Sequence, residues 1–139
     1  MRLSVGGEDK ELSDLLDRAL TEFNARATGV TDEGELSVRA TDDTGAVVGG
    51  VTGWTWGTGC EIHMLWVRDD QRGTGLGTRL VRAAEAEARR RGCRHVAVSS
   101  YTFQAPDFYR KLGYTETGRT PGVPGGHEDV HLHKHLTDD

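Results

Sequence analysis

The chain has little cysteine, no excess of basic residues and no long apolar run. Its two cysteines, Cys60 and Cys93, are too few for a disulfide framework, lack the spacing of a metal site and suit a reducing cytoplasm. The net charge of −5 argues against a nucleic-acid partner, because binding to phosphates needs a basic face. Residues 1–5 hold no apolar signal core, and no window approaches the length of a membrane span. We therefore expect a soluble, cytoplasmic protein without a membrane partner.

The length of 139 residues allows one hydrophobic core and is too short for two, so we expect residues 1–139 to form a single domain. Near the N-terminus, Glu8 and Asp9 are placed to begin a helix and Gly29 to end it. The apolar residues between them recur as on one helix face: Leu12, Leu15, Leu16, Ala19, Leu20 and Phe23.

Runs of β-prone residues predict strands at positions 2–5, 35–40, 46–54, 60–67 and 94–99. The segment 41–45 has the Asp and Gly content of a hairpin turn. Three glycines within 46–54 weaken that strand, which indicates a bulge or the close approach of another group. Strand, helix and strand between residues 60 and 99 follow the order of a right-handed parallel crossover.

A glycine-rich loop joins the strand at 60–67 to an amphipathic helix that begins near Leu76. Unpaired N–H groups and the positive end of the helix dipole meet there, so the loop suits an anion such as a pyrophosphate. A nucleoside-triphosphate loop is excluded, since Gly77 is followed by Thr78 and Arg79 rather than by a lysine. Glycines at every second position also fit the dinucleotide fingerprint poorly.

Two proton acceptors precede this loop. Strict alternation in the strand would place Glu61 and His63 on the face of Leu65 and Val67, opposite Ile62, Met64 and Trp66. Either Glu61 or His63 could act as a general base, directly or through water. A solvated or hydrogen-bonded pair without chemistry is an equally good interpretation.

A helix of about two turns is expected after Pro106, with Phe108 and Leu112 on one face and Gly113 as its cap. Tyr109 falls off that apolar face and is free to point elsewhere. A phenol at this position could serve as a proton donor, and a buried structural tyrosine is the alternative.

Four residues are candidates for contacts with a substrate: Asn24 near the end of the first helix, Trp54 and Trp56 beside the glycine-rich strand, and His127 after a glycine-rich loop at 121–126. Core positions for the tryptophans and a surface position for Asn24 are the alternatives. In the last expected strand, alternation places His131, His133 and His135 opposite Val130, Leu132, Lys134 and Leu136. A metal site is one interpretation of His131, His133 and His135, but a solvated face or cleft lining is the usual one, and we predict no metal.

Two motifs resemble those of one enzyme family. The run Arg72-Gly73-Thr74-Gly75-Leu76-Gly77 resembles the R/Q-x-x-G-x-G/A coenzyme A signature of the GNAT acetyltransferases. Phe108-Tyr109-Arg110-Lys111-Leu112-Gly113-Tyr114 resembles the F-Y-x-K-x-G-F/Y segment that follows it in that family. The resemblance implies a single α/β domain with a mixed, mostly antiparallel sheet of six or seven strands, flanked by three or four helices and splayed at the coenzyme site.

The resemblance also implies roles for residues of this chain. The backbone of Leu65, Trp66 and Val67 would pair with the pantetheine arm of acetyl-CoA, the co-substrate. Tyr109 would be the general acid for the departing thiolate, and Glu61 occupies the position of a glutamate base. Gln104 stands near the place of a usual coenzyme-contacting Asn. The pyrophosphate would be held by loop residues Arg72, Gly73, Thr74, Gly75, Leu76, Gly77 and Thr78.

The expected reaction is direct acetyl transfer to a primary amine, with Glu61 or His63 as base and no nucleophilic cysteine. The acidic net charge favours a small cationic acceptor such as a polyamine or an amino antibiotic. A protein amino group remains an alternative acceptor, and a non-catalytic coenzyme A-binding regulatory domain is an alternative function. By the resemblance, a homodimer is possible.

Overall fold

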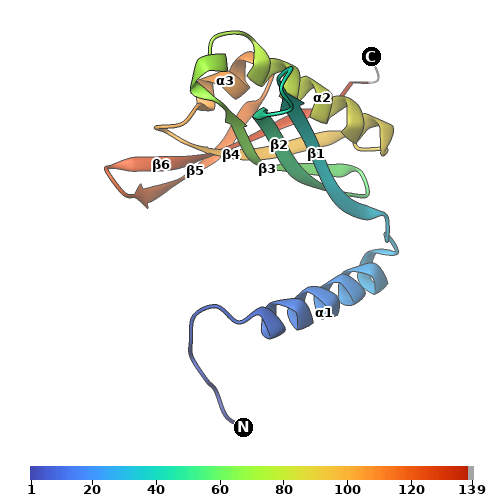
Figure 1. Ribbon diagram of the computed structural model, residues 1–139. Helices are drawn as coiled ribbons and strands as arrows, with labels where there is room; N and C mark the ends of the chain where they lie inside the picture. The colour runs from blue at the N-terminus through green and yellow to red at the C-terminus, as the bar shows by residue number, and fades with distance from the viewer. Residues whose placement is uncertain (138–139) are drawn as a thin grey trace. The chain divides into compact units, whose positions relative to one another are not determined.

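The computed structural model describes residues 1–137, and the chain divides into two compact units, Met1–Thr31 and Asp32–Asp139 (Figure 1). The first unit contains one helix, α1 (Lys10–Thr28). The Asp9 side chain caps it by accepting a hydrogen bond from the Leu12 amide (2.9 Å), and Gly29 ends it with a φ of 72°. The predicted helix is confirmed. The strand predicted at residues 2–5 is wrong, because these residues have no strand to pair with and form a loop.

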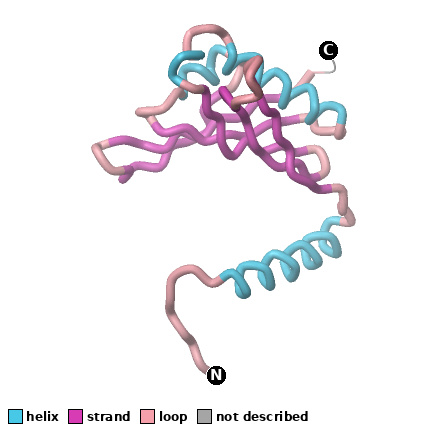
Figure 2. The backbone as a smooth tube through the Cα atoms, viewed as in Figure 1, coloured by secondary structure: helices cyan, strands magenta, loops and turns pink. Residues whose placement is uncertain are grey.

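The second unit is built on one six-stranded sheet with the strand order β1-β2-β3-β4-β6-β5 (Figures 1 and 2). Strands β3 and β4 are parallel, and the other neighbours are antiparallel, so the expected mixed sheet is confirmed. Strand β5 was not expected from the sequence. The elements are β1 (Glu33–Thr41), β2 (Val47–Trp56), β3 (Gly59–Val67), the 3-10 helix η1 (Asp69–Gln71), α2 (Leu76–Arg90), β4 (His95–Tyr101), α3 (Pro106–Lys111), β5 (Thr115–Val123) and β6 (His127–His135).

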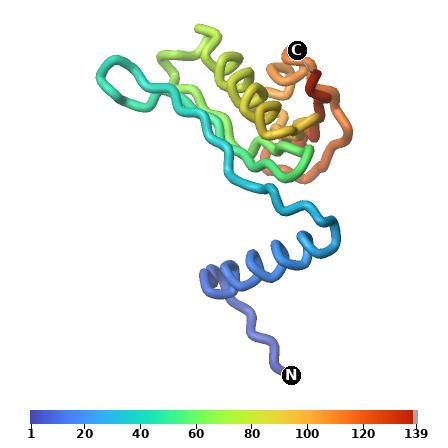
Figure 3. Tube along the Cα trace, turned by 90° about the vertical axis from the view of Figure 1, so that its right-hand side faces the viewer, coloured from blue at the N-terminus to red at the C-terminus, as the bar shows by residue number. Residues whose placement is uncertain are grey.

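The core of the second unit lies between helices α2 and α3 and one face of the sheet. Helix α2 packs along β1, β2 and β3, and α3 packs on β4 and β6 (Figures 1 and 3). The four-residue spacing of Leu80, Ala84 and Ala88 puts these side chains against the sheet, where all three are buried. We call this side of the sheet the helix face and the other side the open face. No helix within residues 1–137 is long and apolar enough to cross a bilayer.

Strand β3 carries a bulge at His63. Ile62 pairs with Gly53 and Met64 with Thr52, so His63 is an extra residue without a partner on β2. Strict alternation along β3 is therefore a wrong prediction: buried Ile62 lies on the helix face with Leu65 and Val67, while Met64 projects from the open face. A Cβ on Gly53 would lie 2.4 Å from the Glu61 carbonyl oxygen. The predicted bulge, with its close backbone approach, is confirmed at this glycine.

A buried carboxylate ties α2 to β6. The Glu85 side chain is 1% exposed and accepts hydrogen bonds from Lys134 Nζ at 3.0 and 3.1 Å. It also accepts from the Tyr114 hydroxyl (2.9 Å) and from Arg82 (3.0 Å). Burial, together with the Glu85 charge, raises the pKa of Tyr114 far above its ordinary value. Every polar group in this cluster therefore has a partner, as burial requires.

Candidate active site

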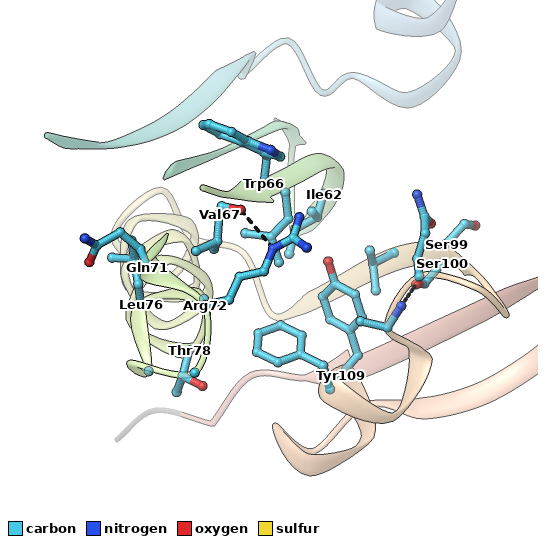
Figure 4. A pocket seen from close by; sticks show the side chains of 18 of the residues that line it. Ile62, Trp66, Val67, Gln71, Arg72, Leu76, Thr78, Ser99, Ser100 and Tyr109 are labelled. Carbon is cyan, nitrogen blue, oxygen red and sulfur yellow. Dashed lines mark hydrogen bonds between the residues drawn. The ribbon is translucent and has the colours of Figure 1, made fainter. Parts of the chain in front are cut away.

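Strands β3 and β4 separate at the middle of the sheet. Their parallel pairing runs from Gly59 with His95 to Ile62 with Val98 and stops at the bulge. Beyond this point the strands splay around a cavity of about 810 Å³, lined by β3, β4, α3 and the loop before α2 (Figure 4). We call it the coenzyme cavity, after the ligand expected from the sequence. Backbone groups along the splayed strand edges have lost their ladder partner and are available to an extended ligand.

The glycine loop closes one end of this cavity. Gly73 and Gly75 take left-handed φ values of 77° and 86°, which side chains rarely adopt, and Gly75 is the N-cap of α2. In the first turn of α2, the amides of Leu76, Gly77 and Thr78 have no intrahelical acceptor, and all three residues line the cavity. The loop therefore presents N–H groups and the positive end of a helix dipole to a bound anion.

Arg72 adds a positive charge beside these amides. Its Nε donates to the Val67 carbonyl (3.2 Å), and its guanidinium pairs with the exposed Asp69 carboxylate (3.0 Å). Figure 4 shows the side chain crossing the cavity toward the end of β3. Because the pair with Asp69 is solvent-exposed and weak, a phosphate can compete for the guanidinium.

Tyr109 enters the cavity from α3. Its ring is buried (5% exposed) and packs edge-on against Phe108 and Tyr114, with ring centroids 5.1 and 5.6 Å away. The hydroxyl points into the cavity and has no hydrogen-bond partner within residues 1–137 (Figure 4). Burial raises the pKa of Tyr109 to about 12. The phenol is therefore protonated at neutral pH and free to donate to a ligand.

A second cavity of about 510 Å³, which we call the open-face hollow, contains the two predicted proton acceptors. Glu61 and His63 line it, with 3.9 Å between His63 Nε2 and Glu61 Oε1. Four residues line both cavities: Ile62, His63, Val98 and Ser99. The two spaces therefore meet where β3 and β4 part, so that a group from one can reach a group in the other.

Most of the predicted site residues gather at these cavities. The coenzyme cavity is lined by Leu65, Trp66, Val67, Arg72, Gly73, Gly75, Leu76, Gly77, Thr78, Gln104, His63 and Tyr109. Thr74 is not among the lining residues, because its hydroxyl turns back to the Gln71 carbonyl (2.6 Å). Gln104 uses its side-chain oxygen to accept from the Tyr101 amide (2.9 Å), which leaves its NH₂ group for a ligand.

The predicted substrate contacts are more scattered. Trp54 is an exposed residue of β2 directly opposite Glu61, and Trp56 ends the same strand, so neither lies in a loop. His127 bonds the Thr102 hydroxyl (2.9 Å) and contacts the ring of Phe103, which lines the coenzyme cavity. Asn24 lies on α1 in the first unit. Its substrate role, like that of the tryptophans, stays a prediction.

Several lining residues were not predicted. Gln71, Val98, Ser99, Ser100, Phe103, Ala105 and Phe108 also line the coenzyme cavity. Ser99 and Ser100 lie near the carboxyl end of β4, the second strand of a parallel crossover, and ligands bind beyond such ends in open sheets. Their position near this strand end could have identified them as lining residues from the sequence. In the described part of the chain, no three His, Cys, Asp or Glu side chains are arranged to hold a metal.

The fold, the glycine loop and the splayed strands define the class of the protein. A family model described as "Acetyltransferase (GNAT) family" matches residues 8–114. The chain belongs to the GNAT family and is an acetyltransferase.

Particular relatives agree with this class. The chain is 39% identical over 108 residues to a blasticidin-S acetyltransferase of Streptomyces morookaense, covering 73% of this chain and 77% of the relative. It is 35% identical over 109 residues to an L-methionine sulfoximine/L-methionine sulfone acetyltransferase of Pseudomonas paraeruginosa, covering 73% and 60%. The crystal structure of a proposed acetyltransferase from Agrobacterium tumefaciens superimposes with a TM-score of 0.91 at 26% identity, covering 98% and 100%.

The two cysteines are expected to be inert in the folded protein. Both are buried, and burial raises the pKa of the Cys60 thiol to about 11 and also raises that of Cys93. Iodoacetamide at mildly alkaline pH should therefore label neither cysteine, as followed by mass spectrometry, and should leave acetyl transfer intact. The urea-unfolded protein is the control and should be labelled twice. Rapid labelling of the folded protein with loss of activity would contradict a direct-transfer mechanism.

Proposed function

We propose that the enzyme transfers an acetyl group from acetyl-CoA to a primary amine of a small cationic molecule by direct attack. The observation that carries this proposal is the meeting of two cavities at the point where β3 and β4 part. The donor enters from the coenzyme cavity and the amine from the open-face hollow. Holding both reactants at one opening replaces a bimolecular encounter by a positioned one. We further propose that residues 1–139 work as one domain.

On the donor side, the loop suits the pyrophosphate and the free strand edges suit the pantetheine arm. Amides of the glycine loop and the Arg72 guanidinium supply donors for the phosphates. The backbone of Leu65, Trp66 and Val67 supplies the edge that an amide-bearing arm extends. Gln104 contributes its free NH₂ group. Acetyl-CoA is thus the co-substrate that these residues fit.

On the acceptor side, Glu61 or His63 takes a proton from the ammonium so that the nitrogen can attack. The neutral Tyr109 phenol then protonates the departing thiolate. Burial raises the pKa of Tyr109 and makes the phenol a weaker acid, and burial of the thiolate beside the same ring would raise the proton affinity of the sulfur as well.

The open-face hollow favours a small cationic acceptor. The Glu61 carboxylate in the hollow attracts an ammonium. Trp54 pairs with Glu61 on β2 and does not line the hollow, but its exposed indole could bind a cation that extends beyond it. A volume of about 510 Å³ suits a small molecule. The related enzymes named above act on blasticidin-S and on methionine sulfoximine or sulfone, which supports an amino antibiotic or amino-acid analogue. A cytoplasmic location and a homodimer remain predictions.

The test is thiol release from acetyl-CoA over a panel of amines: blasticidin S, L-methionine sulfoximine, kanamycin, spermidine and a lysine-containing peptide. We expect release with a small amine and none with the peptide. Release with the peptide alone would replace the small acceptor by a protein amino group. If no amine in the panel releases thiol while acetyl-CoA still raises the melting temperature, the result would favour a coenzyme-binding regulatory domain.

A further inference from the structure

His131 is held more firmly than its neighbours on the open face. It lies on β6 directly opposite Ser99 of β4, whose hydroxyl is 2.9 Å from its Nδ1. The Thr120 hydroxyl of β5 is 3.0 Å from its Nε2. The Thr117 hydroxyl also donates to the His131 carbonyl (3.3 Å). Three strands therefore fix this imidazole, and both ring nitrogens have a hydroxyl partner that can either donate or accept.

This histidine also borders the reaction point. His131 lines the open-face hollow with Glu61 and His63, and Ser99 lines both cavities. The side chains of Ser99, His131 and Thr120 therefore form, in this order, a hydrogen-bonded path from the meeting point of the cavities to the exposed strand β5. Glu61 and His63 lie on β3, on the other side of β4 from His131.

The reaction needs more than one proton acceptor. A primary ammonium has three N–H bonds and the amide product has one, so two protons leave the nitrogen in each turnover. Tyr109 returns one proton to the thiolate and regains it from solvent, which leaves one net proton to be released. Glu61 or His63 accounts for the first departure, which produces the attacking amine. The second departs only once the nitrogen carries the acetyl carbon.

We propose that Ser99, His131 and Thr120 form the relay that removes this second proton. Ser99 Oγ takes the proton from the acylated nitrogen and passes its own to Nδ1. The imidazolium then gives its Nε2 proton to Thr120 Oγ1, whose own proton goes to water, so that bonds and charges balance. This inference rests on the proposed function. His131 acts through Ser99 and is thus a positioning and relay residue.

Other titratable groups face the same region. Glu61 and His63 face the hollow from β3, and Asp129 and His133 flank His131 on its own strand face. From β4 and β5, the groups in contact with His131 are the hydroxyls of Ser99, Thr117 and Thr120. The pH profile of the wild-type enzyme alone therefore cannot assign a limb to His131. Variants of Glu61 and His63 on β3 must therefore be compared with variants of His131 on β6.

The experiment compares His131→Gln with His135→Gln, a matched control on the same strand face that does not line the hollow. Acetyl-CoA and the panel amine that turns over fastest are the substrates. We expect His131→Gln to lower kcat about 10-fold to 100-fold with an unchanged KM for acetyl-CoA, and His135→Gln to match wild type. Thr120→Val, which cuts the exit of the relay, should give a smaller loss in the same direction.

The pH dependence separates the two sides of the hollow. The losses of Glu61→Gln and His63→Gln should shrink as the pH rises toward the pKa of the free acceptor, because the amine then arrives neutral. The loss of His131→Gln should persist, since the second proton leaves only after attack. If His131→Gln equals His135→Gln, or changes only the acceptor KM, the relay is refuted while the proposed function stands. A wild-type enzyme silent across the whole panel would refute the proposed function and the relay with it.

Discussion

Replacing Tyr109 by phenylalanine should lower kcat about 100-fold, because the thiolate then leaves without a positioned acid. The cavity shape is conserved, since only the unpartnered hydroxyl is removed, so the melting temperature and the KM for acetyl-CoA should stay close to wild type. Steady-state thiol release at saturating substrates measures the effect. Tyr101→Phe is the matched control, because Tyr101 is an exposed tyrosine that does not line the coenzyme cavity.

The pH dependence of the Tyr109→Phe loss follows from burial. A pKa raised to about 12 keeps the phenol protonated through the neutral and mildly alkaline range. The ratio of wild-type to variant kcat should therefore remain constant there. Were the hydroxyl to ionise at its ordinary pKa, the acid would be lost on the alkaline side and the ratio would fall toward one. Such a fall, or full activity of the variant, would contradict the general-acid role.

Replacing Glu85 by alanine should destabilise the protein by about 3 kcal/mol, and lower its melting temperature by about 10 °C, because a buried cation loses its partner. Lys134 is only 14% exposed and would be left with an uncompensated charge, and the Tyr114 hydroxyl would lose its acceptor. Urea unfolding at neutral pH measures the change.

Two further variants isolate the cause. Glu87→Ala removes another carboxylate of the same helix, but one whose partners Arg90 and Arg91 remain in contact with solvent, so it should melt close to wild type. Combining Glu85→Ala with Lys134→Met should recover part of the loss, since no buried charge remains. A double variant as unstable as Glu85→Ala would place the cost in lost packing instead.

Much of the fold could be predicted because local patterns dominate it. The apolar spacing of α1 and α2, the hairpin turn at residues 41–45 and the crossover from β3 to β4 each follow from a short stretch of sequence. Strand β5 was missed because it is exposed along most of its length and holds Gly118, Pro121 and Gly122, which argue for a loop. Its pairing with β6, which the sequence pattern does not contain, makes it a strand.

The part of the candidate site that contiguous residues form could be predicted, and the part formed by residues far apart in the sequence was missed. The loop before α2 and Tyr109 belong to contiguous motifs, and nearly all of these residues line one cavity. Ser99, Thr120 and His131 are separated in sequence and meet only through the pairing of β4, β6 and β5. The orientation of the β3 residues was also hidden, because a single unpaired residue reverses the alternation.

The bulge at His63 makes the site of this enzyme sensitive to the deletion of a single codon. Without residue 63, β3 would alternate regularly from Cys60 to Val67, with the same apolar side chains facing α2. The loss of one codon would thus yield a straighter strand that still satisfies the core, while removing the irregularity at which β3 leaves β4. We therefore expect deletion of residue 63 to affect folding little and catalysis strongly.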